Sequence, residues 1–336
     1  MIKFGIIGMG ERGRMFLETI RQNPFAEVAA VCDNNPVAVK AAETDYGVKC
    51  FTDFKEMMDS EKLSAVIVAT PDFLHKDPVI YAAGKGLDML VEKPFSTDEK
   101  ECEEMLAAIE KNNVKCMVAF ENRWNLPIAA VKAQIDAGRL GDILNINARL
   151  SNRIWVPTQY LSWSKGSSVA WFLFPHILDM TMWFNGYKKV KQVYCAGTKK
   201  KLVSMGYDLY DTYQAIVSFE DGTNATLCST WVLPDSLALG YDLKMEVIGT
   251  ESAVNINTHD QCVQHLKSDR IDNIHSLSQP INGRLTGCPS YMLHYFIDCL
   301  KDGVQPECDA KLGAYNTRII CAIHKSAEEG GTIIRF

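Results

Sequence analysis

The stretch IKFGIIGMGERGRMFLETIR, residues 2–21, decides the fold expected for this chain. It opens with a mostly apolar run typical of a buried strand and continues as a helical pattern over residues 14–21. Gly8 permits a tight turn between the two, Gly10 lets the backbone approach a phosphate, and Gly13 lets the helix pack closely on the strand. This spacing predicts a dinucleotide-binding strand–turn–helix unit.

An acidic residue in the expected place supports this interpretation. Asp33 follows the next predicted strand, residues 28–32, about twenty residues after the last glycine of the turn. A carboxylate there can accept hydrogen bonds from both ribose hydroxyls of NAD, and it repels the 2′-phosphate of NADP. Asn34 comes next, with no arginine to receive that phosphate, so NAD is expected rather than NADP. We expect Met9 and Arg12 of the turn to contact the cofactor; the alternative is a plain glycine turn with Asp33 as a surface cap.

The order of strand and helix patterns divides the chain into two domains. Strands and helices alternate over residues 1–122, which predicts an α/β Rossmann domain with a parallel sheet. Beyond that point strands follow one another, which predicts a second α/β domain, residues 123–336, with a large, mostly antiparallel open sheet. The last helix, residues 310–328, is an element that could pack back on the first domain. The strands expected in the second domain cover residues 143–150, 190–196, 213–219, 225–231, 243–248 and 253–256.

The composition restricts the class of function. The chain has 336 residues with 47% hydrophobic and 23% charged, and its net charge is −6. We expect no nucleic-acid or membrane partner, because basic clusters and long apolar runs are missing from the sequence. The 11 cysteines are scattered among apolar runs, which indicates reduced thiols and a soluble, cytoplasmic protein. No CxxC or HExxH spacing occurs, so no protein-bound metal is expected.

Two further segments follow predicted strands at their carboxyl ends, where ligands bind in open α/β sheets. One contains Thr70, Pro71 and His75, and the other is Glu92-Lys93-Pro94. Pro94 disfavours a helical conformation for Lys93 and permits a cis peptide bond before it. A lysine near an oxidised nicotinamide would have a lowered pKa and could exchange the proton of a substrate hydroxyl during hydride transfer. The alternative is an ordinary surface lysine before a loop.

With these motifs the chain resembles the glucose–fructose oxidoreductase / inositol dehydrogenase family (Gfo/Idh/MocA). The resemblance rests on the glycine turn, on Pro71 and His75, and above all on Glu92-Lys93-Pro94. It continues through Arg123 and the segment Pro175-His176-Ile177-Leu178-Asp179, and so covers nearly the whole chain. It implies an NAD-dependent dehydrogenase or reductase acting on CH–OH groups of sugars, cyclitols or related polyols. It also implies a homodimer or homotetramer formed through the sheet of the second domain.

The resemblance also assigns roles to residues. Lys93 matches the family's catalytic lysine and His176 its catalytic histidine, with a buried core histidine as the alternative for His176. Glu92 and Pro94 would position Lys93. Three residues would line the cofactor: Thr70, Pro71 and His75.

One departure from the family pattern bears on the substrate. Many members carry Asp-x-Gly-x-His, and here Phe172 and Phe174 replace the Asp and the Gly. The catalytic pair must then act alone or recruit another group, such as Asp179, whose alternative role is support of the core. The two phenylalanines make the pocket less polar, which indicates a less hydroxylated substrate or one with an apolar substituent. The candidate substrate contacts are Arg123, Trp163, Phe172 and Asp179.

Two other functions fit the same motifs. The chain could be a glycosidase that uses NAD for transient oxidation, or a degenerate member that binds NAD or a sugar without turnover. The loss of the Asp at position 172 is the main support for the degenerate member.

Overall fold

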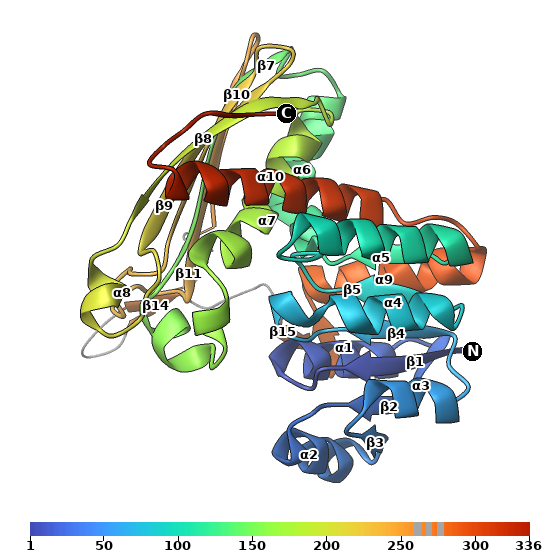
Figure 1. Ribbon diagram of the computed structural model, residues 1–336. Coiled ribbons are helices and arrows are strands. Elements are labelled where there is room, and N and C mark those ends of the chain that lie inside the picture. Colours follow the sequence, from blue (N-terminus) through green and yellow to red (C-terminus); the bar gives the residue numbers. More distant parts are fainter. Residues whose placement is uncertain (259–263, 267–270, 274–278) are drawn as a thin grey trace. The chain divides into compact units, whose positions relative to one another are not determined.

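The computed structural model describes residues 1–258, 264–266, 271–273 and 279–336. These residues form two compact units (Figure 1). The first consists of Met1–Trp124 and the described part of Leu277–Thr317, and the second takes the rest. The division falls inside α10 (Ala310–Glu328). The expected domain boundaries stay a prediction. In the structure, the described part of residues 277–317, which the sequence assigned to the second domain, clusters with the first unit.

The first unit is built on a six-stranded sheet in the order β3-β2-β1-β4-β5-β6. All of its strand pairs are parallel, and this order is that of dinucleotide-binding Rossmann sheets. The strands are β1 (Ile2–Ile7), β2 (Ala26–Cys32), β3 (Lys49–Phe51), β4 (Ala65–Val68), β5 (Asp88–Val91) and β6 (Cys116–Val118). The predicted parallel sheet is therefore confirmed, with the short β3 in addition.

Helix ends in this unit follow from capping residues. Asn35 accepts a hydrogen bond from the Val37 N–H at 3.0 Å, and Gly47 ends that helix in the left-handed conformation. For the helix after β5 the cap is Asp98, which accepts from the Glu101 N–H at 2.9 Å because its carboxylate directly precedes the first turn. The helices are α1 (Glu11–Arg21), α2 (Pro36–Tyr46), α3 (Phe54–Ser60), α4 (Lys76–Gly84), α5 (Glu99–Asn112) and α9 (Cys288–Asp302).

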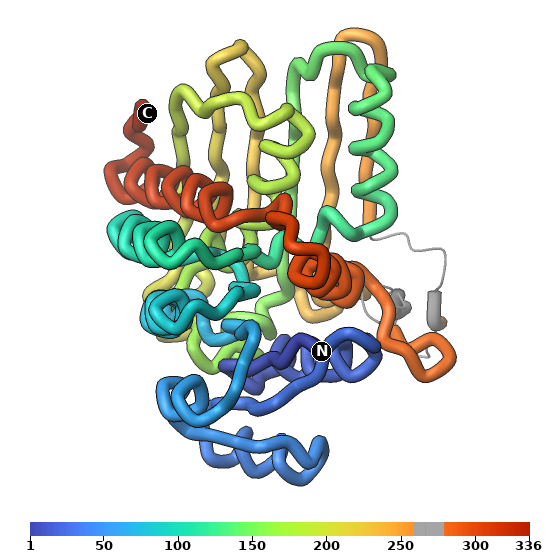
Figure 2. Tube along the Cα trace, turned by 90° about the vertical axis from the view of Figure 1, so that its right-hand side faces the viewer, coloured from blue at the N-terminus to red at the C-terminus, as the bar shows by residue number. Residues whose placement is uncertain are grey.

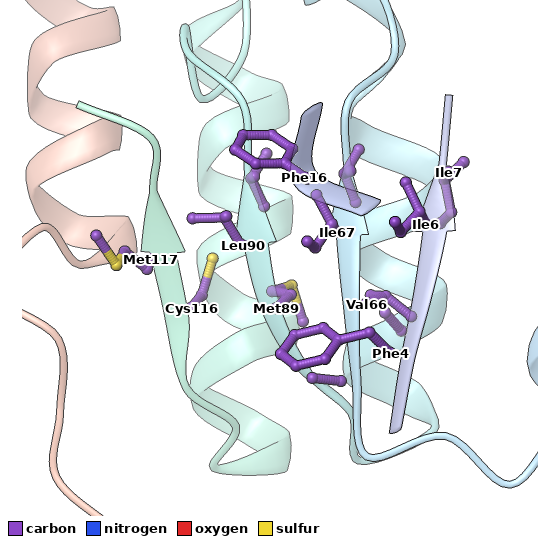
Figure 3. Packing of buried hydrophobic residues seen from close by; sticks show 14 of the residues in the cluster. Phe4, Ile6, Ile7, Phe16, Val66, Ile67, Met89, Leu90, Cys116 and Met117 are labelled. Carbon is purple, nitrogen blue, oxygen red and sulfur yellow. The ribbon is translucent and has the colours of Figure 1, made fainter. Parts of the chain in front are cut away.

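The core of the first unit lies on both faces of the parallel sheet. Figure 3 shows side chains of β1, β4, β5 and β6 packed against one another and against Phe16 of α1. The late helix α9 completes this core, since Phe296 lies 6.4 Å from Phe4 between ring centroids. Figure 2 shows the orange segment of α9 beside α1, which agrees with the contacts between these helices. Burial of apolar side chains on both faces holds the strand ends in place.

The second unit is built on a seven-stranded sheet in the order β12-β11-β7-β10-β9-β8-β17. Its strand pairs are antiparallel except β7 with β10, which confirms the mostly antiparallel sheet. The strands are β7 (Ile143–Asn152), β8 (Val190–Thr198), β9 (Thr212–Phe219), β10 (Asn224–Thr230), β11 (Tyr241–Gly249), β12 (Ala253–Asn257) and β17 (Ile334–Arg335). The predicted extents of β7 to β12 differ from these bounds by one or two residues at their ends.

One helix dominates the buried face of that sheet. Helix α7 (Val169–Phe184) packs on β7, β9 and β10, and Figure 1 shows it with α6 (Leu126–Asp136) on one side of the strands. Ser168 caps α7 by accepting the Trp171 N–H at 3.0 Å. Smaller elements are η1 (Asp72–Leu74), η2 (Glu121–Trp124), η3 (Val156–Tyr160), η4 (Ser164–Gly166), α8 (Lys201–Ser204), β13 (Gln264–Leu266), β14 (Ile271–Asn273), β15 (Gln279–Ile281) and β16 (Arg284–Thr286). Within the described residues, no helix combines the length and apolar character that crossing a bilayer requires.

Candidate functional site

The glycine turn joins β1 to α1 at the carboxyl edge of the first sheet. Gly8 has φ +94°, and a Cβ there would lie 2.5 Å from the Ala69 carbonyl oxygen, so no side chain fits. A Cβ on Gly13 would lie 1.9 Å from the carbonyl oxygen of Gly8, so the helix can approach the strand only with glycine. At Gly10, the N-cap of α1, an added Cβ would meet nothing within 4 Å. The turn is therefore packed against Ala69 at Gly8, and it leaves open space at Gly10, beside the N-terminus of α1.

Asp33 supports this turn from the end of β2. One carboxylate oxygen accepts the Met9 N–H at 2.7 Å, and the other accepts the Asn35 N–H at 2.8 Å. A carboxylate has about four lone-pair sites, so these two bonds leave acceptor capacity for hydroxyl donors. Met9 is 1% exposed, so its side chain is buried and its backbone N–H makes the contact with Asp33. Asn34 is exposed.

The predicted His75 is part of the scaffold behind the strand ends. It is 1% exposed. Its Nδ1 lies 2.8 Å from the Pro94 carbonyl oxygen and its Nε2 lies 3.0 Å from that of Thr70. The imidazole therefore ties the Thr70–Pro71 turn to the Lys93–Pro94 turn, whose peptide bond is cis.

The segment Glu92-Lys93-Pro94 continues β5 at the same edge of the sheet. The Glu92 N–H still donates to the Val68 carbonyl oxygen at 2.8 Å, so the strand pairing holds its backbone. One Glu92 carboxylate oxygen accepts the Lys93 N–H at 3.1 Å. Burial lowers the pKa of the Lys93 amine. The Glu92 and Glu121 carboxylates raise this pKa, but the effect of burial is larger. An amine with a lowered pKa is suited to take and return a proton near neutral pH.

Arg12 joins the glycine turn to this segment. Its Nε donates to Glu92 Oε1 at 2.6 Å, and its Nη2 donates to Glu121 Oε2. Glu121 lies in η2, just after β6, and sequence reasoning did not single it out. The signal was its position, because it follows the next parallel strand and so reaches the same edge as Asp33 and Glu92.

Three further candidates lie on α7 in the second unit. Phe172, His176 and Asp179 are spaced by four and three residues, which places them on one face of this helix. Phe172 and His176 are half-buried and Asp179 is 1% exposed. The Phe172 ring lies 6.0 Å from Trp163 and 5.9 Å from the buried Trp231 between centroids. His176 therefore has an aromatic cluster one helical turn away.

The candidate residues divide between the two units. The first unit brings together the glycine turn, Asp33, Thr70–Pro71 and Glu92-Lys93-Pro94 through the contacts above. Arg123, expected among the substrate contacts, lies buried in η2 of this same unit. His176 and the remaining substrate candidates lie in the second unit, so the catalytic pair stays a prediction.

The first unit fits a dinucleotide. The open space at Gly10 faces a helix N-terminus, which supplies amide donors and a positive dipole end to phosphates. Asp33 offers a carboxylate at the end of the neighbouring strand. Described residues contain no group of three or more His, Cys, Asp or Glu side chains arranged to hold a metal ion.

Comparisons with known proteins agree with this geometry. Residues 2–120 match the family model described as an oxidoreductase family with an NAD-binding Rossmann fold, GFO_IDH_MocA. Residues 128–255 match the model for the C-terminal domain of the same family.

Individual relatives are more distant. An inositol 2-dehydrogenase of Rhizobium meliloti is 26% identical over 75% of this chain and 74% of its own length. An uncharacterized oxidoreductase of Streptococcus pneumoniae is 32% identical, but the match covers 49% of this chain and 44% of that protein. The crystal structure of myo-inositol 2-dehydrogenase from Lactobacillus plantarum has a TM-score of 0.87 at 21% identity, with 100% and 99% of the chains covered. The fold is thus shared over the whole chain.

Proposed function

Since this chain belongs to the Gfo/Idh/MocA oxidoreductase family, we propose that it is an NAD-dependent dehydrogenase of a sugar, cyclitol or related polyol. The observation that carries the proposal is one connected set of contacts at a single sheet edge. There the glycine turn, Asp33 and the Lys93 segment are tied together by the bonds from Met9 and Arg12. The inositol dehydrogenase relative supports a polyol substrate.

Residue roles follow from this chemistry. The glycine turn holds the pyrophosphate, and Asp33 accepts the ribose hydroxyls and disfavours a 2′-phosphate. Bound NAD supplies an acceptor for the hydride that leaves the carbinol carbon. The Lys93 amine takes the hydroxyl proton as the carbonyl forms. The role proposed for His176 is that of a hydrogen-bond donor to a substrate oxygen. In the reverse direction Lys93 returns that proton.

The substrate class follows from the aromatic cluster around Phe172. Phe172 and Trp163 are half-buried and present ring surface about one helical turn from His176, while the fully buried Trp231 packs against Phe172. Such rings bind the C–H face of a sugar ring or an apolar substituent rather than a hydroxyl. We therefore favour a polyol with a deoxy, methyl or acyl substituent, with Arg123 and Asp179 as polar candidates.

Location and assembly are proposed on separate grounds. All ten described cysteines are free thiols, which supports a reducing compartment such as the cytoplasm. On the sheet of the second unit, the cross-strand neighbours Tyr194 and Ile216 are 39% and 45% exposed, whereas Cys195 and Val217, next along each strand, are buried. Two adjacent exposed apolar side chains on an open sheet face support a homodimer or homotetramer through that face.

The test is a screen of sugars and polyols with NAD and NADP separately, following absorbance of the reduced cofactor. Lys93→Met should lower kcat/KM by about 10²- to 10⁴-fold, because general base catalysis is lost. NADH affinity, measured by fluorescence titration, should stay within a few-fold. Lys100→Met, an exposed lysine of α5, is the matched control.

The outcomes separate this function from its two rivals. A glycosidase would turn over many substrates without net NADH, and a degenerate member would bind NAD yet stay silent across the panel. The relatives favour the dehydrogenase over both. Unchanged turnover in Lys93→Met would remove Lys93 from the mechanism.

A further inference from the structure

Arg12 binds two carboxylates that come from other strand ends. Its Nε donates to Glu92 at 2.6 Å and its Nη2 to Glu121. The side chains of Glu92 and Glu121 are only 7% and 13% exposed, whereas the Arg12 side chain is 31% exposed, so the two carboxylates are shielded from water and the guanidinium is partly exposed. The guanidinium lies 5.2 Å from the centroid of the Phe16 ring, which restricts its plane. A planar fork of donors suits two carboxylates at once, whereas a lysine ammonium does not.

The same carboxylates act on Lys93. Glu92 precedes it in the chain and accepts its backbone N–H. Burial has the largest influence on the pKa of the Lys93 amine and lowers it. Glu92, Glu121 and Asp72 raise that pKa, and the positive charge of Arg12 lowers it. Within the first unit these four charged side chains, from the end of β5 and from η2, η1 and α1, are the ones that act most strongly on the amine.

Glu92 and Glu121 attract two cations, Arg12 and Lys93. A carboxylate that is paired with one of these cations attracts the other less strongly. Such an attraction is stronger between shielded groups than in bulk water, because the effective dielectric constant is lower. A carboxylate that turned from Arg12 to Lys93 would therefore favour a protonated lysine. A protonated lysine cannot accept the proton of a substrate hydroxyl.

We propose that Arg12 is a positioning residue for the reaction: it holds Glu92 and Glu121 in its own ion pairs and so limits their attraction for the Lys93 ammonium group. Because Arg12 belongs to the first turn of α1, its ion pair with Glu92 also links the glycine turn to the end of β5, which Lys93 follows. The inference rests on the proposed role of Lys93 as the proton acceptor.

Two substitutions should move the titration of Lys93 in opposite directions. Arg12→Gln removes a cation and releases both carboxylates, so the Lys93 titration midpoint should rise by about one pH unit or more. Glu121→Gln removes one carboxylate and leaves Arg12 paired with Glu92, so the midpoint should fall. The measurement is the ¹³C shift of Lys93 in protein labelled with [ε-¹³C]lysine, assigned by its loss in Lys93→Met, without NAD or substrate.

The same variants should shift the pH profile of kcat/KM for oxidation. Activity is lost as pH falls through the pKa of a base, so the acid limb should move to higher pH in Arg12→Gln and to lower pH in Glu121→Gln. Arg21→Gln is the matched control, because it removes one positive charge from the far end of the same helix. It should leave both the NMR midpoint and the acid limb in place.

The outcomes are distinguishable. An unchanged Lys93 midpoint in both variants, or shifts of the same sign, would overturn the inference. If Arg12→Gln does not fold, Arg12→Lys replaces it: an ammonium keeps the positive charge but does not suit both carboxylates at once, so the Lys93 midpoint should still rise, and an unchanged midpoint would overturn the inference. Because the NMR titration needs no substrate, opposite shifts support the inference even if the polyol screen is silent, a result that would count against the proposed function alone.

Discussion

Asp33 performs two tasks at the scale of a single residue. Its carboxylate accepts the Met9 N–H of the glycine turn, and we propose that its charge also repels the 2′-phosphate of NADP. Asp33→Ala removes both, so the preference for NAD over NADP in kcat/KM should narrow by about 10- to 100-fold, which is about 1.4–2.7 kcal/mol. Steady-state kinetics with each cofactor measures this ratio.

A second substitution separates the charge from the hydrogen bond. Asp33→Asn keeps an oxygen that can accept the Met9 N–H but loses the negative charge. It should narrow the cofactor preference nearly as far as Asp33→Ala while disturbing the turn less. An NAD to NADP ratio that stayed at the wild-type value in both variants would exclude charge repulsion as the basis of cofactor choice.

At the scale of elements, the start of α7 depends on a histidine from α10. The Ser168 hydroxyl lies 2.7 Å from His324 Nε2, while His324 Nδ1 lies 2.9 Å from the Ile320 carbonyl oxygen. A carbonyl only accepts, so Nδ1 carries the proton and Ser168 donates to Nε2. The imidazole also stacks on Trp171 at 4.6 Å between ring centroids. Burial lowers the pKa of His324 to about 4.

This histidine should make the fold sensitive to acid. Its folded pKa lies below the unfolded value of about 6.5, so the neutral form stabilises the fold above that value, and the stability is lost as pH falls toward about 4. Between pH 7 and pH 5 the loss should be about 2 kcal/mol in the free energy of unfolding. His324→Gln should remove this part of the pH dependence, as measured by urea unfolding at both pH values. An equal loss in the wild type and the variant would contradict the assignment.

At the scale of the whole molecule, the open face of the second sheet sets the expected assembly. Tyr194→Glu together with Ile216→Lys replaces these two exposed apolar side chains by charged ones, so the proposed oligomer should dissociate. Light scattering coupled to size-exclusion chromatography measures the mass. Met205→Lys, an exposed methionine of the same unit outside the sheet, is the control. A wild-type protein that elutes as a monomer would contradict the proposed oligomer.

The sequence by itself determined the local features of this protein. The glycine turn, the cap at Asn35 and the alternation of strands and helices depend on neighbouring residues, so their patterns predict the Rossmann sheet. Successive side chains of a strand point to opposite faces of the sheet, so alternating apolar and polar residues also predict the strands of the second sheet. The candidate residues Asp33 and Lys93 were found in the same way, because each follows a strand.

Only the tertiary structure decided which side chains meet. Arg12 binds Glu92 and Glu121, which are 80 and 109 positions away, and Ser168 meets His324 across 156 positions. Such pairs leave no periodic signal in the sequence, since their distance is set by strand order and helix packing rather than by spacing along the chain. The placement of α9 against β1 has the same origin: its apolar face is evident from the sequence, but the surface that buries it is chosen by the fold.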